Sequence, residues 1–393
     1  MTGDFSPLKR IARRLREEML PRPTSRTRNL PLDGPVVVAG MFRTASGLGE
    51  AAKLTVQGLR TLGLSPTLVD LSSAFRQVDQ EPFDMLGELP RTHRGTLILA
   101  INAPETRAAL QTLGLRRWHN WRIIGYWAWE LNEAPPSWLP IAGHLTEIWT
   151  PSEFVTRTIA SKVQIPVLTV PYPVRPHLKI NPESLHRPAG TPLRVMAMAD
   201  GRSSFFRKNV LAAARIYVRA FSPQNNSRLT IKLRNVAEFP DFQRELHYLI
   251  GDRNDIDIIE GTIPSEQKWD LIASHDIMLS THRAEGYGLH LAEAMSLGLC
   301  AVATGWSGNT QFMNQKNSAL LPYSLEDVID PYDIYDPPIG SQWARIDEDA
   351  GAQVLRDLDI DRDRLTRLRQ AATATDFVAD SISAMEHALT GAN

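Results

Sequence analysis

The strongest constraint on the fold is an alternation of segment types that begins at Pro35. From there, short apolar runs bounded by turn residues alternate with longer amphipathic segments of helical period. This order favours parallel sheets whose strands are joined by crossover helices. In the first half, the predicted strands are Val36–Ala39, Pro66–Asp70, Thr96–Ile101, Arg122–Trp127, Glu147–Trp149 and Val167–Val170.

A proline-rich segment, Pro171–Pro192, shows no clear periodicity and predicts a hinge between two domains. The predicted strands after it are Leu193–Met198, Leu229–Leu233, Ile256–Ile259, Asp276–Leu279, Leu299–Ala303 and Ala319–Leu321. A chain of 393 residues is long enough for two cores. We therefore predict an α/β protein with two Rossmann-like domains that face each other across a cleft. Their bounds are residues 35–175 and 176–365, with an extension and linker over 1–34 and a final helix over 366–393.

Composition excludes several classes of protein. The 43 Lys and Arg nearly balance the 44 Asp and Glu, whereas nucleic-acid-binding domains usually carry a large positive excess. No apolar run is long enough to span a bilayer, and residues 1–30 lack the hydrophobic region of a secretory signal, so we expect a cytoplasmic protein. The single cysteine, Cys300, lies in the apolar run LCAVAT, which predicts a buried small side chain in a reducing compartment.

Residues 6–20 form a basic amphipathic segment. Leu8, Ile11, Leu15 and Met19 fall at helical spacing, and basic residues occupy the other faces. The first 30 residues hold eight Lys or Arg and three Asp or Glu. Two interpretations stay open: a helix lying peripherally on an anionic membrane surface near a lipid-linked acceptor, or a helix packed on its own protein or a partner.

The segment Asp276–Asn309 carries the most information about function. An apolar run ends at His282, and the string EGYGL, which supplies Glu285, Gly286, Tyr287, Gly288 and Leu289, leads into a helix-like stretch with Glu293. The two glutamates, with seven residues between them, bracket a glycine-rich turn at a helix start. The glycines let backbone amides approach a ligand, and the free amides of the helix attract an anion. Glu285 can reach sugar hydroxyls or a cationic anomeric centre, and Glu293 can bind a ribose diol.

This segment resembles the donor site of retaining glycosyltransferases, specifically glycosyltransferase family 4 with its E-x7-E signature. In that family the first glutamate contacts the donor sugar and the second the ribose, which assigns those roles to Glu285 and Glu293. The resemblance covers roughly residues 35–390 and is best over 195–345. It implies a GT-B fold whose last helix returns to the first domain. It also implies metal-independent transfer of a hexose-type sugar, with retention, from a nucleotide sugar to a glycan or lipid-linked acceptor, in bacterial polysaccharide biosynthesis.

A basic loop, ADGRSSFFRKN, lies between a predicted strand and the next helix. Such a loop is where an α/β domain binds phosphate. The resemblance extends to this loop, where a basic pair neutralises the donor diphosphate in the family. Lys208 is one member of the pair, and either Arg207 or Arg202 is the other. We therefore assign a catalytic role to Glu285, Lys208 and Arg207.

Three further elements complete the predicted donor site. The glycine turn with Ser307, Gly308 and Asn309 follows a strand, and we expect its amides to face the donor sugar or phosphate. His282 either orients Glu285 or the sugar, or has a structural role. Thr262 lies in the loop that corresponds to the base-stacking region of the fold.

The first domain supplies two weaker signals. A partial dinucleotide-type glycine pattern holds Gly47 and Gly49, which either face the donor phosphates or acceptor, or form a plain tight turn. The string YWAWE resembles a motif of the same family branch and follows a strand end. Its Trp127, Trp129 and Glu130 are candidates for an acceptor platform, although aromatic residues at alternating strand positions also fit a core.

We expect no metal and no cofactor beyond the nucleotide-sugar co-substrate, because no Asp-x-Asp follows a strand and no spaced His/Cys set is present. Two other functions remain open at this point. One is a nucleotide-sugar epimerase or phosphorylase on a similar fold, and the other is a non-catalytic donor-binding scaffold.

Overall fold

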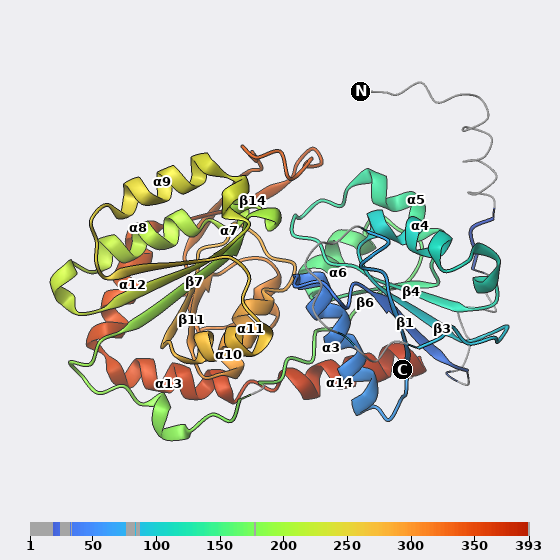
Figure 1. Cartoon of the computed structure of the whole chain (residues 1–393), viewed down its shortest axis with the longest axis horizontal. Coiled ribbons are helices and arrows are strands. Elements are labelled where there is room, and N and C mark those ends of the chain that lie inside the picture. The colour runs from blue at the N-terminus through green and yellow to red at the C-terminus, as the bar shows by residue number, and fades with distance from the viewer. Residues whose placement is uncertain are drawn as a thin grey trace.

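The protein consists of two α/β domains that lie side by side (Figure 1). The computed structural model describes residues 19–23, 32, 34–75, 83, 87–176 and 178–391. The predicted helix of residues 6–20 lies almost wholly outside them. The short described segment that follows is anchored to the first domain: Leu20 is buried in its core, and the Pro21 carbonyl accepts a hydrogen bond from His144 Nδ1 at 2.9 Å.

The first domain contains one parallel sheet in the order β2-β1-β3-β4-β5-β6. Its strands are β1 (Val36–Gly40), β2 (Thr67–Asp70), β3 (Thr96–Ala100), β4 (Arg122–Tyr126), β5 (Glu147–Thr150) and β6 (Val167–Thr169). Its helices are α3 (Gly47–Thr61), α4 (Ala103–Thr112), α5 (Leu139–Ala142) and α6 (Glu153–Ala160), with 3-10 turns η1 (Leu115–Trp118) and η2 (Pro136–Trp138).

The second domain repeats the design with the order β12-β11-β10-β7-β8-β9. Its strands are β7 (Arg194–Asp200), β8 (Arg228–Arg234), β9 (Ile256–Glu260), β10 (Ile277–Ser280), β11 (Cys300–Thr304) and β12 (Ala319–Leu321). Its helices are α7 (Phe205–Lys208), α8 (Val210–Ala220), α9 (Pro240–Ile250), α10 (Ser265–Ala273), α11 (Leu289–Ser296), α12 (Glu348–Ile360) and α13 (Arg362–Thr373). The 3-10 turns are η3 (Pro182–Leu185), η4 (Gly201–Ser203), η5 (Pro223–Asn225), η6 (Val236–Glu238) and η7 (Gly308–Gln311).

Each predicted strand is present, and the predicted bounds agree with the structure to within two residues. The apolar runs are informative because the central strands are covered by helices on both faces: every residue of β1, β3, β10 and β11 is buried. The antiparallel hairpin of β13 (Tyr323–Asp327) and β14 (Gln342–Ile346) was not predicted. Four of the five residues of β13 are exposed, so it lacks an apolar run.

The strand orders place the functional region. In each sheet the order reverses beside the first strand, between β1 and β3 in one domain and between β7 and β10 in the other. Ligands of open α/β sheets bind outside the carboxyl ends of the strands at this point.

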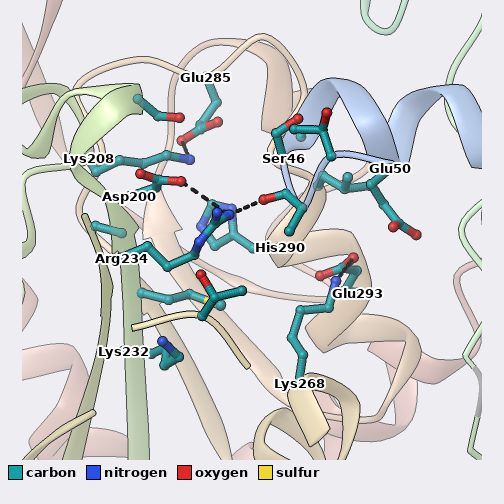
Figure 2. Close-up of a pocket in the computed structure, with 18 of the residues that line it drawn as sticks. Ser46, Glu50, Asp200, Lys208, Lys232, Arg234, Lys268, Glu285, His290 and Glu293 are labelled. Atoms are coloured by element: carbon teal, nitrogen blue, oxygen red, sulfur yellow. Dashed lines mark hydrogen bonds and ion pairs between the residues drawn. The ribbon is translucent and has the colours of Figure 1, made fainter. Parts of the chain in front are cut away.

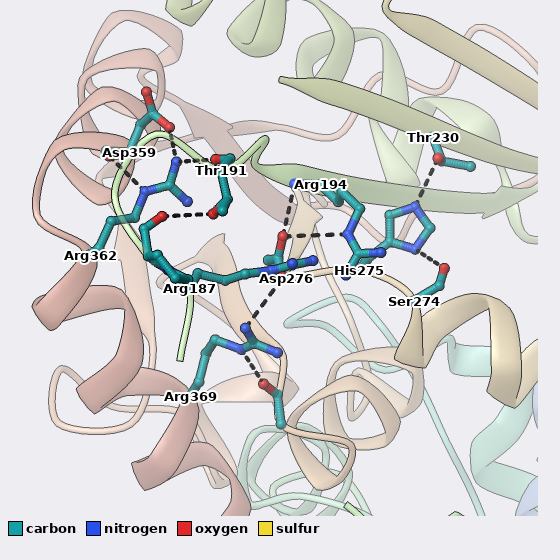
Figure 3. Close-up of polar contacts among 12 residues, drawn as sticks. Arg187, Thr191, Arg194, Thr230, Ser274, His275, Asp276, Asp359, Arg362 and Arg369 are labelled. Atoms are coloured by element: carbon teal, nitrogen blue, oxygen red, sulfur yellow. Dashed lines mark hydrogen bonds and ion pairs between the residues drawn. The ribbon is translucent and has the colours of Figure 1, made fainter. Parts of the chain in front are cut away.

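A buried ion cluster fixes the amino edge of the second sheet (Figure 3). Asp276, which is fully buried before β10, accepts hydrogen bonds from Arg187 Nε at 2.5 Å and Arg369 Nη1 at 3.2 Å. It also accepts one from the Arg194 backbone amide at 3.0 Å. Arg187 lies in the proline-rich segment and Arg369 lies in α13, so one carboxylate connects the interdomain linker, the sheet and a C-terminal helix.

The last helix, α14 (Phe377–Thr390), returns to the first domain and packs on α3 (Figure 1). The chain crosses over later than predicted, because α13 still packs on α11 and β11 of the second domain. Buried Arg122, at the start of β4, donates to the carbonyls of Ala388 and Leu389 at 2.5 and 2.6 Å and pairs with Glu147 at 2.8 Å. It therefore satisfies carbonyls at the end of α14 that have no partner within the helix.

Two further features of the fold concern the single cysteine and the length of the helices. Cys300 is fully buried in β11, where burial raises the pKa of its thiol to about 12. Within the described ranges, no helix is both long and apolar enough to cross a membrane.

Replacing Arg122 by alanine should destabilise the protein by about 3–5 kcal/mol, because Glu147 and the end of α14 would lose a buried partner. Thermal unfolding of wild type, Arg122→Ala, Glu147→Gln and the double variant measures this effect. We expect the double variant to lose less stability than the sum of the single losses. Additive losses would contradict a direct interaction.

Candidate active site

Two adjoining cavities lie between the domains where the carboxyl ends of the two sheets face each other. The small cavity, of about 310 Å³, is lined mainly by residues that follow β7, β8, β9 and β10 and by the start of α3. The large cavity, of about 1050 Å³, extends toward residues that follow β3 and β4 of the first domain. Residues lining both include Thr44, Ser46, Gly47, Glu130, Asp200, Ser203, Arg234, Glu285 and Leu289.

Lys208 and Glu285 form the central ion pair of the small cavity (Figure 2). Lys208 Nζ lies 2.5 Å from Glu285 Oε1, and Arg207 Nη1 lies 3.2 Å from the same oxygen. Ser204 begins α7 by accepting a hydrogen bond from the Arg207 amide at 3.1 Å. A short helix after β7 therefore brings two cations to the loop after β10.

The charges of this cluster follow from burial and pairing. Burial opposes ionisation of Glu285, but Lys208 and Arg207 outweigh burial and hold the pKa of its carboxyl well below the usual range. Burial lowers the pKa of Lys208, and Glu285 partly opposes that shift. The two cations face two carboxylates, because Glu130 Oε1 lies 3.9 Å from Arg207 Nη2. In a site of low dielectric, an anionic ligand would compete with these carboxylates for Lys208 and Arg207.

Arg207, and not Arg202, is the arginine beside Lys208. The Arg207 guanidinium is buried and donates to the carbonyls of Ala284 at 2.6 Å and Ser203 at 2.9 Å. Arg202 instead lines the large cavity and forms a solvent-exposed pair with Glu238 at 2.7 Å. Arg207 therefore holds the loop of Glu285 in place as well as contributing charge.

Three further cations line the small cavity and were not among the predicted site residues: Lys232, Arg234 and Lys268. Arg234 lies 3.3 Å from Asp200 and donates to the Ala45 carbonyl of the other domain. Lys232 and Arg234 end β8, so two basic residues at a strand's carboxyl end were the available signal. In the described part of the chain, no three His, Cys, Asp or Glu converge as metal ligands.

Glu293 lines the same small cavity as Glu285 (Figure 2). It is buried on α11 and pairs with Lys268 of α10 at 2.7 Å. Burial raises the pKa of its carboxyl, Lys268 opposes that shift, and Glu50 of α3 adds to it. The two glutamates predicted from the sequence are thus brought to one cavity, each with its own lysine.

The glycine turn after β11 does not line either cavity in the described chain, contrary to the prediction for Ser307, Gly308 and Asn309. It supports Glu285 from behind instead. Ser307 Oγ accepts from the Glu285 amide at 2.8 Å, and the Gly308 amide donates to the Glu285 carbonyl at 2.8 Å. A Cβ at Gly308 would lie 2.2 Å from the Gly286 carbonyl oxygen, so only glycine permits this close approach.

The other predicted donor residues are distributed over the two cavities. Thr262 lines the small cavity, Leu289 lines both, and Gly286, Tyr287 and Gly288 line the large one. Gly288 begins α11 at a φ of 89°, a backbone angle that favours glycine. His282 is fully buried outside both cavities, so the structure does not place it against a sugar.

In the first domain, Gly47 lines both cavities at the start of α3, but Gly49 does not. Ser46 caps this helix by accepting from the Gly49 amide at 3.2 Å. A Cβ at Gly49 would lie 2.1 Å from the Thr44 carbonyl oxygen, whereas a Cβ at Gly47 would meet no atom within 4 Å. Gly49 is therefore a packing residue, and the prediction that it faces a ligand was wrong.

The YWAWE string likewise contains both cavity-lining residues and a core residue. Trp129 and Glu130 line the large cavity, and Glu130 also lines the small one. The prediction for Trp127 was wrong: its side chain is fully buried in the core and packs edge-on against Trp138. Trp127 follows the buried strand β4 directly, and alternation then directs Trp129 to the same side but beyond the end of the sheet.

Comparison with known proteins agrees with this geometry. Residues 205–330, which hold α7, Glu285 and Glu293, match the family described as Glycosyl transferases group 1. No curated protein matches the chain in sequence.

Several solved structures share the two-domain arrangement. A glycosyltransferase from Rickettsia africae is 13% identical, with a TM-score of 0.60 over 91% of this chain and 98% of that chain. Anabaena HepE, in complex with UDP and glucose, is 12% identical, with a TM-score of 0.58 over 90% and 98%. The pneumococcal O-GlcNAc transferase GtfA, in complex with UDP and GlcNAc, is 14% identical, with a TM-score of 0.53 over 75% of this chain and 56% of that chain. This chain thus spans little more than half of GtfA, and the similarities confirm the predicted GT-B fold.

The two glycines of α3 give a matched test of these roles. Gly49→Ala should lower stability by about 1–3 kcal/mol, because its Cβ must displace a backbone carbonyl. Gly47→Ala should leave the melting temperature unchanged. Equal melting temperatures of the two variants would contradict the packing role of Gly49.

Proposed function

We propose that the protein transfers a hexose-type sugar from a nucleoside-diphosphate sugar to a glycan or lipid-linked acceptor, with retention of configuration. The observation that carries the proposal is the buried Lys208–Glu285 pair at the carboxyl edge of the second sheet. It lies within the segment that matches the glycosyltransferase family. The structures of HepE with UDP and glucose and of GtfA with UDP and GlcNAc support a nucleotide-sugar donor.

We assign the donor one orientation in the small cavity. Its diphosphate takes the region of Lys208, Arg234 and the amino ends of α3 and α11, where cations and free backbone amides favour an anion. Its ribose lies toward Glu293, and its base lies toward Thr262 after β9. Its sugar then lies at Glu285, where the two cavities adjoin.

The reaction breaks the bond between the anomeric carbon and the diphosphate oxygen and forms one to an acceptor oxygen. Negative charge develops on the departing diphosphate, and the fixed cations stabilise that charge without needing to reorganise. Ionised Glu285 can stabilise positive charge on the anomeric carbon. The proposal assigns the electrostatic work to side chains and includes no metal ion.

The acceptor enters through the large cavity. Trp129 packs edge-on against Trp138 and Tyr335 there, and Glu130 lies where the two cavities meet. An aromatic wall with a nearby carboxylate suits a sugar, which offers apolar faces and hydroxyl donors. Association of residues 6–20 with a membrane and a role in polysaccharide assembly stay predictions.

Loss of either central charge should slow transfer strongly while leaving the fold intact. We expect Lys208→Ala and Glu285→Gln each to lower the rate about 10²–10³-fold, because each removes a charge that stabilises the transition state. The measurement is product formation from UDP-glucose and GDP-mannose, with and without acceptor sugars and with and without EDTA. Product anomers are assigned by NMR. Lys316→Ala, which removes an exposed lysine, is the control.

Undiminished turnover in both site variants would refute the proposal. Release or rearrangement of sugar without an acceptor would instead indicate a phosphorylase or epimerase. Donor binding without any turnover would indicate a scaffold, and loss of activity in EDTA would contradict metal independence.

Trp129→Ala should raise the KM for acceptor with little change in donor affinity, because Trp129 lines only the large cavity. Steady-state kinetics with each substrate varied in turn separates the two effects. Tyr248→Ala removes an exposed aromatic side chain of α9 and is the control. A larger effect on donor affinity than on acceptor KM would place the acceptor elsewhere.

A further inference from the structure

A chain of hydrogen bonds runs behind the small cavity and ends at His290, a residue that the sequence did not single out. His290 Nε2 lies 3.0 Å from Ser280 Oγ, and Ser280 Oγ lies 3.0 Å from His282 Nδ1. His282 Nε2 in turn lies 3.0 Å from Asn309 Oδ1, and Asn309 Nδ2 donates to the Thr304 carbonyl at 2.9 Å. The His290 ring lines the small cavity, and the His282 ring is fully buried.

When both imidazoles are neutral, only one assignment of donors and acceptors satisfies every hydrogen bond in this series. The Thr304 carbonyl only accepts, so the Asn309 amide nitrogen faces it and Asn309 Oδ1 faces His282. His282 Nε2 must therefore carry the proton, and His282 Nδ1 must accept from the Ser280 hydroxyl. Ser280 has then used its only proton, so its oxygen accepts from His290 Nε2–H.

This assignment leaves His290 Nδ1 with a lone pair. Across the described part of the chain, that nitrogen has no hydrogen-bond partner, whereas Nε2 is committed to Ser280. His290 Nδ1 is thus a hydrogen-bond acceptor in a cavity that both cations and carboxylates line.

Burial, together with the charges around it, keeps His290 neutral in the free protein. Burial lowers the pKa of its imidazole to about 3, Lys208 adds to this shift, and Glu285 opposes it. Arg207 and His282 also lower it. The other charged or titratable groups that line the same cavity are Glu50, Glu130, Asp200, Lys232, Arg234, Lys268 and Glu293.

We propose that binding of the donor diphosphate is coupled to uptake of one proton by His290 Nδ1. This inference rests on the proposed function, which brings a diphosphate into the cavity that His290 lines. A phosphate oxygen beside Nδ1 requires a donor, and an added proton supplies that donor while every bond of the chain stays in place. Moving the existing proton from Nε2 to Nδ1 would instead leave two lone pairs facing each other in the buried chain. The proton comes from solvent and returns to it when the diphosphate leaves.

Calorimetry measures this coupling directly. UDP-glucose and GDP-mannose are suitable probes, because both of their phosphates are esterified and no phosphate titrates near neutral pH. Each is titrated into the full chain at pH 6.5 in two buffers of low and high ionisation enthalpy. We expect the heats to differ by the uptake of about one proton, and the affinity to rise up to about tenfold per unit fall in pH.

Two variants assign the proton to a residue. His290→Gln keeps an amide donor for Ser280 but cannot titrate, so it should bind with equal heats in both buffers. His275→Gln is the matched control: His275 is also a buried histidine of this domain, bonded to Thr230 at 2.8 Å outside the cavities, and its replacement should leave the uptake unchanged (Figure 3).

The possible outcomes separate this inference from the proposed function. Wild-type binding with equal heats in both buffers shows no net proton uptake and overturns the coupling alone. Uptake that survives in His290→Gln assigns the proton to another group and also overturns it. Failure of both nucleotide sugars to bind wild type overturns the proposed function, and the coupling with it.

Discussion

The arrangement of the site depends on one buried charge cluster, in which Glu285 is shared by Lys208 and Arg207. A carboxylate in this position would be costly to bury alone, and so would either cation. Together they connect α7, which follows β7, to the loop that follows β10, across the point where the strand order reverses. The glycine turn after β11 then holds both the amide and the carbonyl of Glu285. The cluster therefore fixes the position of Glu285 before any ligand arrives, and Lys208 lines the cavity where an anion can reach it.

Buried residues that line neither cavity still determine which hydrogen-bond donors and acceptors the small cavity presents. Asn309 and His282 lie outside it, yet their hydrogen bonds fix which nitrogen of His290 carries a proton. Arg207 donates two hydrogen bonds to backbone carbonyls, so it both holds the backbone of the site in place and contributes a positive charge. The preorganisation of the small cavity thus comes largely from a second layer of residues.

Much of the fold and part of the site could be predicted from the sequence, for physical reasons that individual residues illustrate. The strands were predictable because parallel strands buried on both faces need continuous apolar runs, as in β1 and β11. Lys208, Glu285 and Glu293 were predictable because they follow such strands in recognisable strings. Lys268 was not, since only its partner from a distant segment shows its position. Arg234 was missed although basic residues at the carboxyl end of β8 were a signal. Gly49 and Trp127 fit sequence motifs, but both pack inside the protein. Residue spacing in the sequence does not show this packing.

The return of α14 to the first domain means that the chain passes between the domains twice. The two passages lie next to each other, because Ser381 of α14 donates to the carbonyl of Pro171 at 2.6 Å. The proline-rich passage is in turn fastened to the second domain through Arg187 and Asp276. Both connections between the domains are therefore held against folded domains by side-chain hydrogen bonds.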